Sequence, residues 1–268
     1  MYDKSSYSKE HTAYLNKIKR NEILVITTRI MVLVFFIALW EIAANFEWID
    51  PFITSQPSKI IKTFGTLLAS GTLFVHLFTT VIETIIGFVV STLAGTFIAI
   101  ILWWSPFLSR VADPYLVVLN SLPKVALGPV ILVWVGAGPA AIIVMALLIS
   151  LFVTITSVYT GFREVDEAKI TLVKTFGGTK IQVLKNVLLP ATYPTIASAL
   201  KINVGLSWVG VIMGEFLVSK AGLGYLIIYG SQVFQLDLVM TSTVVLAVAA
   251  GVMYATVAWF EKKIIPYK

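Results

Sequence analysis

Runs of apolar residues long enough to cross a membrane recur along the whole chain. The clearest occupy residues 30–46, 77–104, 140–162, 196–218 and 238–260. A helix needs roughly 20 mainly apolar residues to span the hydrocarbon core of a bilayer. Charged residues make up 13% of this chain, whereas soluble domains average about 25%. The sequence therefore predicts an all-α, polytopic membrane protein and excludes the soluble globular classes.

A further apolar stretch, residues 115–135, carries helix breakers in its middle. Pro123 and Pro129 interrupt it, and Lys124 adds a charge between them. Broken backbone at membrane depth is tolerated where it faces protein or a water-filled cavity. We therefore expect a broken third span, which makes six spans in all, preceded by a short loop at residues 105–114.

The distribution of basic residues predicts that both termini are cytoplasmic. The polar amino-terminal region, counted through Arg29, holds six basic residues, residues 163–190 hold five, the carboxyl-terminal tail three and the loop at 105–114 one. Segments on the other side of six alternating spans hold only three. Such an excess marks the cytoplasmic side of a membrane protein. We divide the chain into a cytoplasmic tail, residues 1–28, and a six-span transmembrane domain, residues 29–268.

A polar, basic island at residues 163–190 interrupts the apolar pattern. Gly177 and Gly178 predict the end of a first short helix, because glycine adopts the left-handed cap conformation without a Cβ penalty. Thr179, with Gln182 three residues later, predicts a capping box that begins a second helix. Pro190 predicts the end of that helix, because proline lacks the backbone N–H.

The second helix of the island is expected to carry one apolar face. Its members follow helical spacing, with Lys180 and Lys185 off the face; they are Ile181, Leu184, Val187 and Leu188. Two interpretations are open. The island is either an ordinary cytoplasmic loop between spans or an element that docks on another protein.

Five ionisable residues lie within the predicted spans: Glu41, Glu83, Lys124, Lys201 and Glu215. A charge inside a membrane is costly, so each is a candidate functional residue. The alternative is that each reaches the interface or pairs with a neighbour. The candidates for lining a polar path through the membrane are Pro123, Lys124, Pro129 and Glu215.

The sequence contains no arrangement of residues typical of an enzyme. Gly178-Thr179-Lys180 lacks the glycine pattern of a phosphate-binding loop. There are no cysteines, and His11 and His76 match no metal-ligand spacing. The basic residues form no stripe for a nucleic acid. We therefore expect no catalytic residue, metal, bound cofactor or nucleic-acid partner, and no nucleotide hydrolysis by this chain.

The island resembles the cytoplasmic "EAA" loop of binding-protein-dependent ABC importer permeases. That loop reads Glu-Ala-Ala, three residues, Gly, nine residues, an aliphatic residue, any residue, then Leu-Pro. Gly177, Val187 and Leu189-Pro190 match this pattern, whereas residues 171–173 read Thr-Leu-Val in place of Glu-Ala-Ala. The resemblance identifies the island as a coupling loop.

Two other stretches resemble the subfamily of these permeases that imports nitrate, sulfonates, taurine, bicarbonate or pyrimidine precursors. One is residues 122–129, Leu-Pro-Lys-Val-Ala-Leu-Gly-Pro, followed by Trp134. The other is Glu215 followed by Gly-Leu-Gly-Tyr at residues 222–225. The resemblance runs from about residue 40 to the end of the chain.

The resemblance implies a type I importer permease in the bacterial cytoplasmic membrane, working as a homodimer. A separate ATP-binding cassette ATPase subunit would hold ATP and Mg, and an extracytoplasmic solute-binding protein would deliver the solute. The implied solute is a small sulfonate-, taurine- or nitrate-like anion, or a pyrimidine or riboflavin-type vitamin precursor. The residues implied to couple the permease to the ATPase are Gly177, Gly178, Thr179, Ile181, Leu184, Val187, Leu188, Leu189 and Pro190.

Two rival classes remain open. An ion-coupled secondary transporter would account for the broken span and Lys124, although it gives the island no role. An intramembrane enzyme needs paired catalytic groups at membrane depth, which the sequence does not offer. Dependence of uptake on ATP, with the ion gradient kept, would separate the importer from the ion-coupled carrier.

Overall fold

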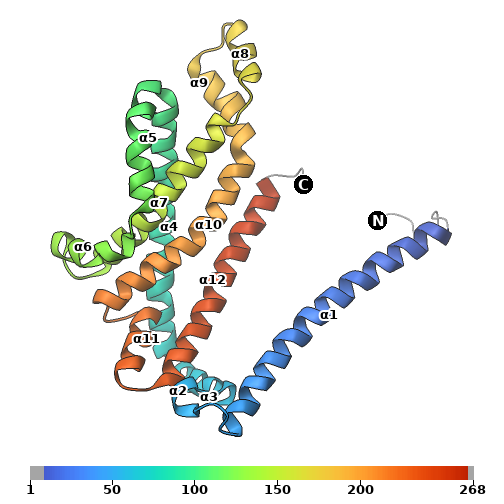
Figure 1. The fold of residues 1–268 in the computed structure, drawn as a ribbon, viewed down its shortest axis with the longest axis vertical. Helices are drawn as coiled ribbons and strands as arrows, with labels where there is room; N and C mark the ends of the chain where they lie inside the picture. The colour runs from blue at the N-terminus through green and yellow to red at the C-terminus, as the bar shows by residue number, and fades with distance from the viewer. Residues whose placement is uncertain (1–8, 265–268) are drawn as a thin grey trace. The chain divides into compact units, whose positions relative to one another are not determined.

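The computed structural model describes residues 9–264, which are helical apart from short connections (Figure 1). The chain divides into two units, residues 1–63 and 64–268. The first eight and last four residues, which belong to the expected polar tails, lie outside the described part, as does the side chain of His11.

The first unit consists of α1 (Lys9–Asn45), α2 (Pro51–Thr54) and the beginning of α3 (Pro57–Ala69). The candidate span within α1 covers residues 13–45. It is longer than the 17-residue apolar run, residues 30–46, from which the first span was predicted. α1 continues through residue 28 without a break. The boundary predicted between the cytoplasmic tail and the transmembrane domain therefore does not coincide with a helix end. Glu41 accepts a hydrogen bond from the backbone N–H of Ser58 at 3.0 Å, which satisfies a free donor in the first turn of α3.

The second unit holds the remaining helices. They are α4 (Thr72–Trp104), α5 (Pro106–Ser121), α6 (Gly128–Val135), α7 (Pro139–Arg163), α8 (Glu167–Thr175), α9 (Lys180–Val183), α10 (Leu189–Val218), α11 (Leu223–Gln232) and α12 (Leu236–Ile264). Over the described residues of the whole chain, five helices are long and apolar enough to cross a membrane. The number is six if the bent pair formed by residues 106–121 and 124–135 counts as one span. Six spans is also the number predicted from the sequence.

The structure corrects the expected loop at residues 105–114. That segment is the first half of α5, which begins at Pro106. Ser105 caps the helix by accepting a hydrogen bond from the N–H of Leu108 at 3.3 Å, and proline suits the first helical position because its N–H would be unpaired there. The predicted break near Pro123 is confirmed, since the chain bends by 87° between α5 and the segment containing α6.

The expected end of the island helix at Pro190 is wrong. A π-helical turn, Leu184–Leu188, joins α9 to α10, so the helix continues from Lys180 to Val218. Pro190 cannot donate to the carbonyl of Asn186, and its ring crowds that oxygen. The wider π turn accommodates the proline, with the N–H of Leu189 donating to the carbonyl of Leu184.

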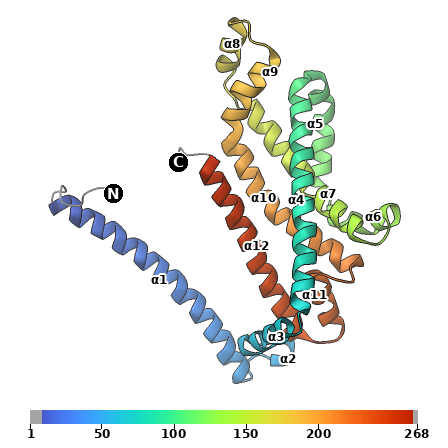
Figure 2. The same cartoon turned by 180° about the vertical axis from the view of Figure 1, so that it is seen from behind.

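The core of the second unit forms where α7 packs against α4 and α10. Small residues bring these helices close together. A Cβ atom on Gly87 would lie 2.7 Å from the Cβ of Ala146, and one on Gly210 would overlap the Ala146 backbone. Within this unit, both views place α8 and α9 at one end and α11 at the other (Figures 1 and 2).

Candidate functional site

The turn between α8 and α9 is built by local hydrogen bonds. Asp166 begins α8 by accepting from the N–H of Ala168 at 2.8 Å. At the other end Gly177 has a φ of +76°, a conformation that glycine adopts without strain. The N–H of Gly178 then donates to the carbonyl of Val173 at 2.9 Å, the wide bond of a Schellman cap. The predicted glycine stop is confirmed.

The predicted capping box at the start of α9 is also confirmed. Thr179 accepts from the N–H of Gln182 at 3.3 Å, and the Gln182 side chain accepts from the N–H of Thr179 at 2.7 Å. Lys180, the next residue, donates to the carbonyl of Trp104 at the end of α4 at 2.5 Å. The bond from Lys180 fixes the position of α9 relative to α4.

The apolar face predicted for the island helix lies mostly against the protein itself. Leu188 is fully buried, and Leu184 and Val187 pack on the same cluster. Val183, which the sequence-based face did not include, is also fully buried there. This burial follows from the continuous helix, because the face that leads into α10 must cover the junction with α4 and α7.

Three large apolar side chains of the island remain exposed. Leu172 is 57% exposed, Phe176 85% and Ile181 64%. We call them the exposed triad. Only Ile181 was expected from the sequence. Leu172 and Phe176 lie four residues apart, so the helical spacing of the first island helix was the signal that could have found them.

The candidate path residues at the broken span lie together at the bend. Pro123 precedes a 3₁₀ turn, Lys124–Leu127, and Pro129 stands in the first turn of α6. Lys124 donates to the carbonyl of Asn120 at 3.0 Å, and its ammonium lies 5.8 Å from the ring centroid of Phe152. The lysine therefore supplies a donor to a carbonyl at the end of α5, where the helix leaves carbonyls unpaired.

Glu215, the fourth candidate, lies in a different environment. It is 1% exposed and accepts from Thr80 Oγ1 on α4 at 2.6 Å and from the N–H of Gly224 on α11 at 2.5 Å. Thr80 in turn accepts from the N–H of Leu223 at 2.7 Å, and the buried Glu83 carboxyl contacts Glu215. This carboxyl cluster joins α4, α10 and the start of α11.

The sequence placed Glu215 and the segment 222–225 in one resemblance, and the structure brings them into contact. A Cβ on Gly222 would overlap the Glu215 carboxyl, so a side chain at this position would displace it. Beside it, the N–H of Gly222 donates to Nδ1 of His76 at 2.9 Å. The contact of Glu83 with Glu215 was not predicted, because it depends on the packing of α4 against α10.

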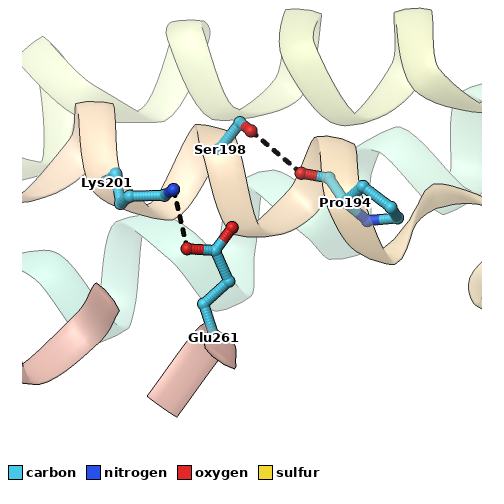
Figure 3. A network of polar contacts seen from close by, with 4 residues as sticks. All are labelled: Pro194, Ser198, Lys201 and Glu261. Carbon is cyan, nitrogen blue, oxygen red and sulfur yellow. Dashed lines mark hydrogen bonds and ion pairs between the residues drawn. The ribbon is translucent and has the colours of Figure 1, made fainter. Parts of the chain in front are cut away.

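Lys201, the remaining ionisable residue, forms an ion pair. Its Nζ lies 2.6 Å from Glu261 Oε2, which joins α10 to α12 (Figure 3). One turn earlier in α10, Ser198 donates to the carbonyl of Pro194 at 2.9 Å. The interpretation that such a charge pairs with a neighbour is therefore correct for Lys201.

Comparison with known proteins assigns this architecture to a family. Residues 91–266 match the family described as binding-protein-dependent transport system inner membrane component. A probable ABC transporter permease protein of Haemophilus influenzae is 30% identical over 85% of this chain and 92% of its own. The putative aliphatic sulfonates transport permease protein SsuC of Bacillus subtilis is 26% identical over 87% of this chain and 84% of its own. The taurine transport system permease protein TauC of Escherichia coli is 22% identical over 90% of both chains.

Solved structures agree on the fold. A chain of a bacterial ABC transporter involved in the import of the acidic polysaccharide alginate matches with a TM-score of 0.64 and 16% identity. The match covers 94% of this chain and 99% of that one. The ion-coupled carrier is not supported by these relatives, and the island lies within the matched family region. The chain therefore belongs to the inner membrane components of binding-protein-dependent transport systems, as a permease subunit of an ABC importer.

Proposed function

We propose that the island docks on a separate ATPase subunit through the exposed triad and transmits its movement to α10. The single observation that carries this proposal is the unbroken helix from Lys180 to Val218. Because α9, the π turn and α10 form one helix, a displacement of α9 is passed directly into the membrane. Phe176, 85% exposed at the tip of a rigid turn, suits insertion into an apolar groove on a partner.

The coupling residues then divide into two groups. The exposed Ile181, with Leu172 and Phe176, would contact the ATPase. The others would hold the island in shape: Gly177, Gly178 and Thr179 form the turn, while Leu184, Val187, Leu188, Leu189 and Pro190 form the junction with α10. The exposed cations Lys169 and Lys174 lie on α8, which also carries Leu172, and such cations favour an acidic partner surface.

Membership of a binding-protein-dependent family implies an ATPase and a solute-binding protein as partners. We infer that the permease works as a homodimer, with both termini cytoplasmic, and that ATP and Mg bind to the partner ATPase. A second copy would shield the polar groups of a solute path from lipid. Closure of the two ATPases would then rock the paired membrane domains between inward- and outward-facing states.

The solute proposed first is a small sulfonate-bearing molecule, either an aliphatic sulfonate anion or a taurine-like zwitterion, because relatives named for aliphatic sulfonates and taurine match 87% and 90% of this chain. A pyrimidine or riboflavin-type vitamin precursor is the second candidate. Permeases named for formylaminopyrimidine in Halalkalibacterium halodurans and riboflavin in Chloroflexus aurantiacus are 28% and 23% identical to this chain.

Purification of the permease from its own membranes in mild detergent tests the docking. We expect an ATPase subunit in equal amount, and its loss from Leu172→Ser/Phe176→Ser/Ile181→Ser. This triple variant is sharper than scrambling residues 179–188, because it spares Val183 and Leu188, which fill the protein's own core. Ile202→Ser, on an exposed apolar residue of α10, is the control. A folded permease that is purified without an ATPase, or a triple variant that keeps it, would overturn the proposal.

A further inference from the structure

A cavity of about 220 Å³ lies between α5 and α7, and most of the residues around it are polar. Asp113 and Asn120 line it from α5, and Tyr159, Thr160 and Arg163 line it from α7. Arg163 is the last residue of α7 and the first of the island. The cavity therefore adjoins the coupling loop but contains none of the proposed docking residues.

Four polar side chains of this cavity are available to a ligand: Asp113, Asn120, Thr160 and Arg163. In the described part of the chain, the side chains of Asp113, Asn120 and Thr160 form no hydrogen bond, and Asp113 and Arg163 form no ion pair. Arg163 only lies over the ring of Tyr159, 5.9 Å from its centroid. The Tyr159 hydroxyl is bonded to Ser109, which fixes the ring. The N–H groups of Arg163 thus remain free to donate.

The location of the cavity argues that it meets water or a ligand and not lipid. Both helices belong to candidate membrane spans, residues 106–121 and 139–163. Asp113 and Arg163 are both exposed, and Arg163 is the last residue of α7, so the cavity opens to water at the end of the unit that carries the island. A polar hollow at this end of two spans suits the mouth of a solute path.

The two opposite charges define the chemistry of the ligand. A guanidinium binds a tetrahedral oxyanion through two parallel N–H groups, and the Asn120 amide and the Thr160 hydroxyl add neutral donors. Asp113 offers carboxylate oxygens to an ammonium group. The volume suits a molecule of only a few heavy atoms. We propose that this cavity binds a small zwitterion, with its oxyanion on Arg163 and its ammonium group on Asp113.

This inference rests on the proposed function, since it assigns to the transported solute a binding site within the permease. The position of Arg163 gives that site a connection to the ATPase. Only residues 164–166 separate α7 from α8, so a displacement of the island would change the position of the guanidinium relative to Asp113. The site would bind the zwitterion in one state of the island and release it in the other.

Equilibrium dialysis of the full chain in lipid nanodiscs tests the site with three radiolabelled probes of similar size. The probes are taurine (a zwitterion), ethanesulfonate (an anion) and ethylammonium (a cation). We expect taurine to bind most tightly. Arg163→Gln should weaken taurine and ethanesulfonate binding about tenfold or more, because it removes a charge-assisted pair of hydrogen bonds. Asp113→Asn should weaken taurine binding but not ethanesulfonate binding, because the substitution removes the partner of the ammonium group and a charge that repels the anion.

Arg110→Gln is the matched control, because Arg110 lies on α5 outside the cavity lining and donates to the carbonyl of Pro106. It should bind all three probes as the unmodified chain does. Absence of taurine binding at millimolar concentration, or equal taurine binding by the Arg163→Gln variant, would overturn the proposal. So would equal binding of taurine and ethanesulfonate, because Asp113 would then have no role.

The phosphoethanolamine head of a lipid has the same chemistry as the proposed solute. Nanodiscs of phosphatidylglycerol alone and of phosphatidylethanolamine distinguish the two sources. Equal taurine binding in the two kinds of nanodisc supports a soluble zwitterion as the ligand. Loss of taurine binding in phosphatidylethanolamine nanodiscs would instead assign the cavity to the lipid headgroup, which would compete with taurine there. The proposed function has a separate test: it would be overturned if the purified permease carried no ATPase. Dialysis without an ATPase reports on the cavity alone.

Discussion

Lys180 Nζ donates to the carbonyl oxygen of Trp104, which ties the first residue of α9 to the last residue of α4. The last carbonyls of a helix have no partner in the helix and carry partial negative charge, so a lysine is stabilising there. The ammonium also lies 5.7 and 5.1 Å from the ring centroids of Trp103 and Trp104. The island is therefore attached to α4 as well as to its neighbours in the chain.

Removal of this attachment should loosen the coupling of the island to the membrane domain. In the Lys180→Met variant we expect ATP-driven uptake to fall several-fold while the ATPase remains bound, because the exposed triad is unchanged. Uptake into proteoliposomes and co-purification measure the two effects. Lys185→Met removes another exposed island cation and should transport normally. Equal uptake by both variants would show that the bond to Trp104 transmits no force.

Two substitutions of Gly177, by Asp and by Asn, separate the effect of backbone strain from the effect of charge at the docking surface. Its φ is +76°, and a Cβ there would meet no atom within 4 Å. Asp and Asn both tolerate this conformation better than other residues, at a cost of about 1 kcal/mol. We expect Gly177→Asp to fold but to uncouple transport, because it puts a carboxylate beside Phe176. Gly177→Asn should retain most of the uptake, and equal loss in the two variants would attribute the defect to the backbone.

The sequence predicted those parts of the fold that depend on local chemistry. The spans, the break near Pro123, the glycine stop at Gly177 and the capping box of Thr179 follow from apolar length and neighbouring hydrogen-bonding groups. The capping box could be found because its two hydrogen bonds join residues only three positions apart. Short-range signals of this kind need no knowledge of tertiary packing.

The errors arose where tertiary contacts decide the outcome. Pro190 alone predicts a helix end, but burial of Val183 and Leu188 favours a continuous helix, and a π turn accommodates the proline. The apolar spacing in the island identified a helical face but not whether that face meets a partner or the protein's own core. The contact between Glu83 and Glu215 joins residues far apart in sequence, so it could not be predicted from spacing.

The hydroxyl of Thr80 should stabilise the carboxyl cluster. It donates to Glu215 and accepts from the N–H of Leu223. The Thr80→Val variant keeps the shape but leaves both buried partners short of a hydrogen bond. We expect a loss of about 1–3 kcal/mol in the free energy of unfolding. Thr79→Val, whose hydroxyl bonds only to the carbonyl of Val75 in its own helix, is the control. Thermal unfolding in detergent measures both, and matching melting temperatures would contradict the role assigned to Thr80.

Substitution of glycine by alanine should have opposite effects at two positions of α10. A Cβ on Gly210 would overlap the backbone of Ala146 in α7, which cannot move aside as a flexible side chain can. Gly210→Ala should therefore destabilise the protein by about 1–3 kcal/mol through overpacking. A Cβ on Gly205 meets no atom within 4 Å, and alanine favours a helix over glycine by about 1 kcal/mol. Gly205→Ala should leave the melting temperature unchanged or raise it. If Gly210→Ala were equally well tolerated, the close approach of α7 to α10 would not limit the size of this residue.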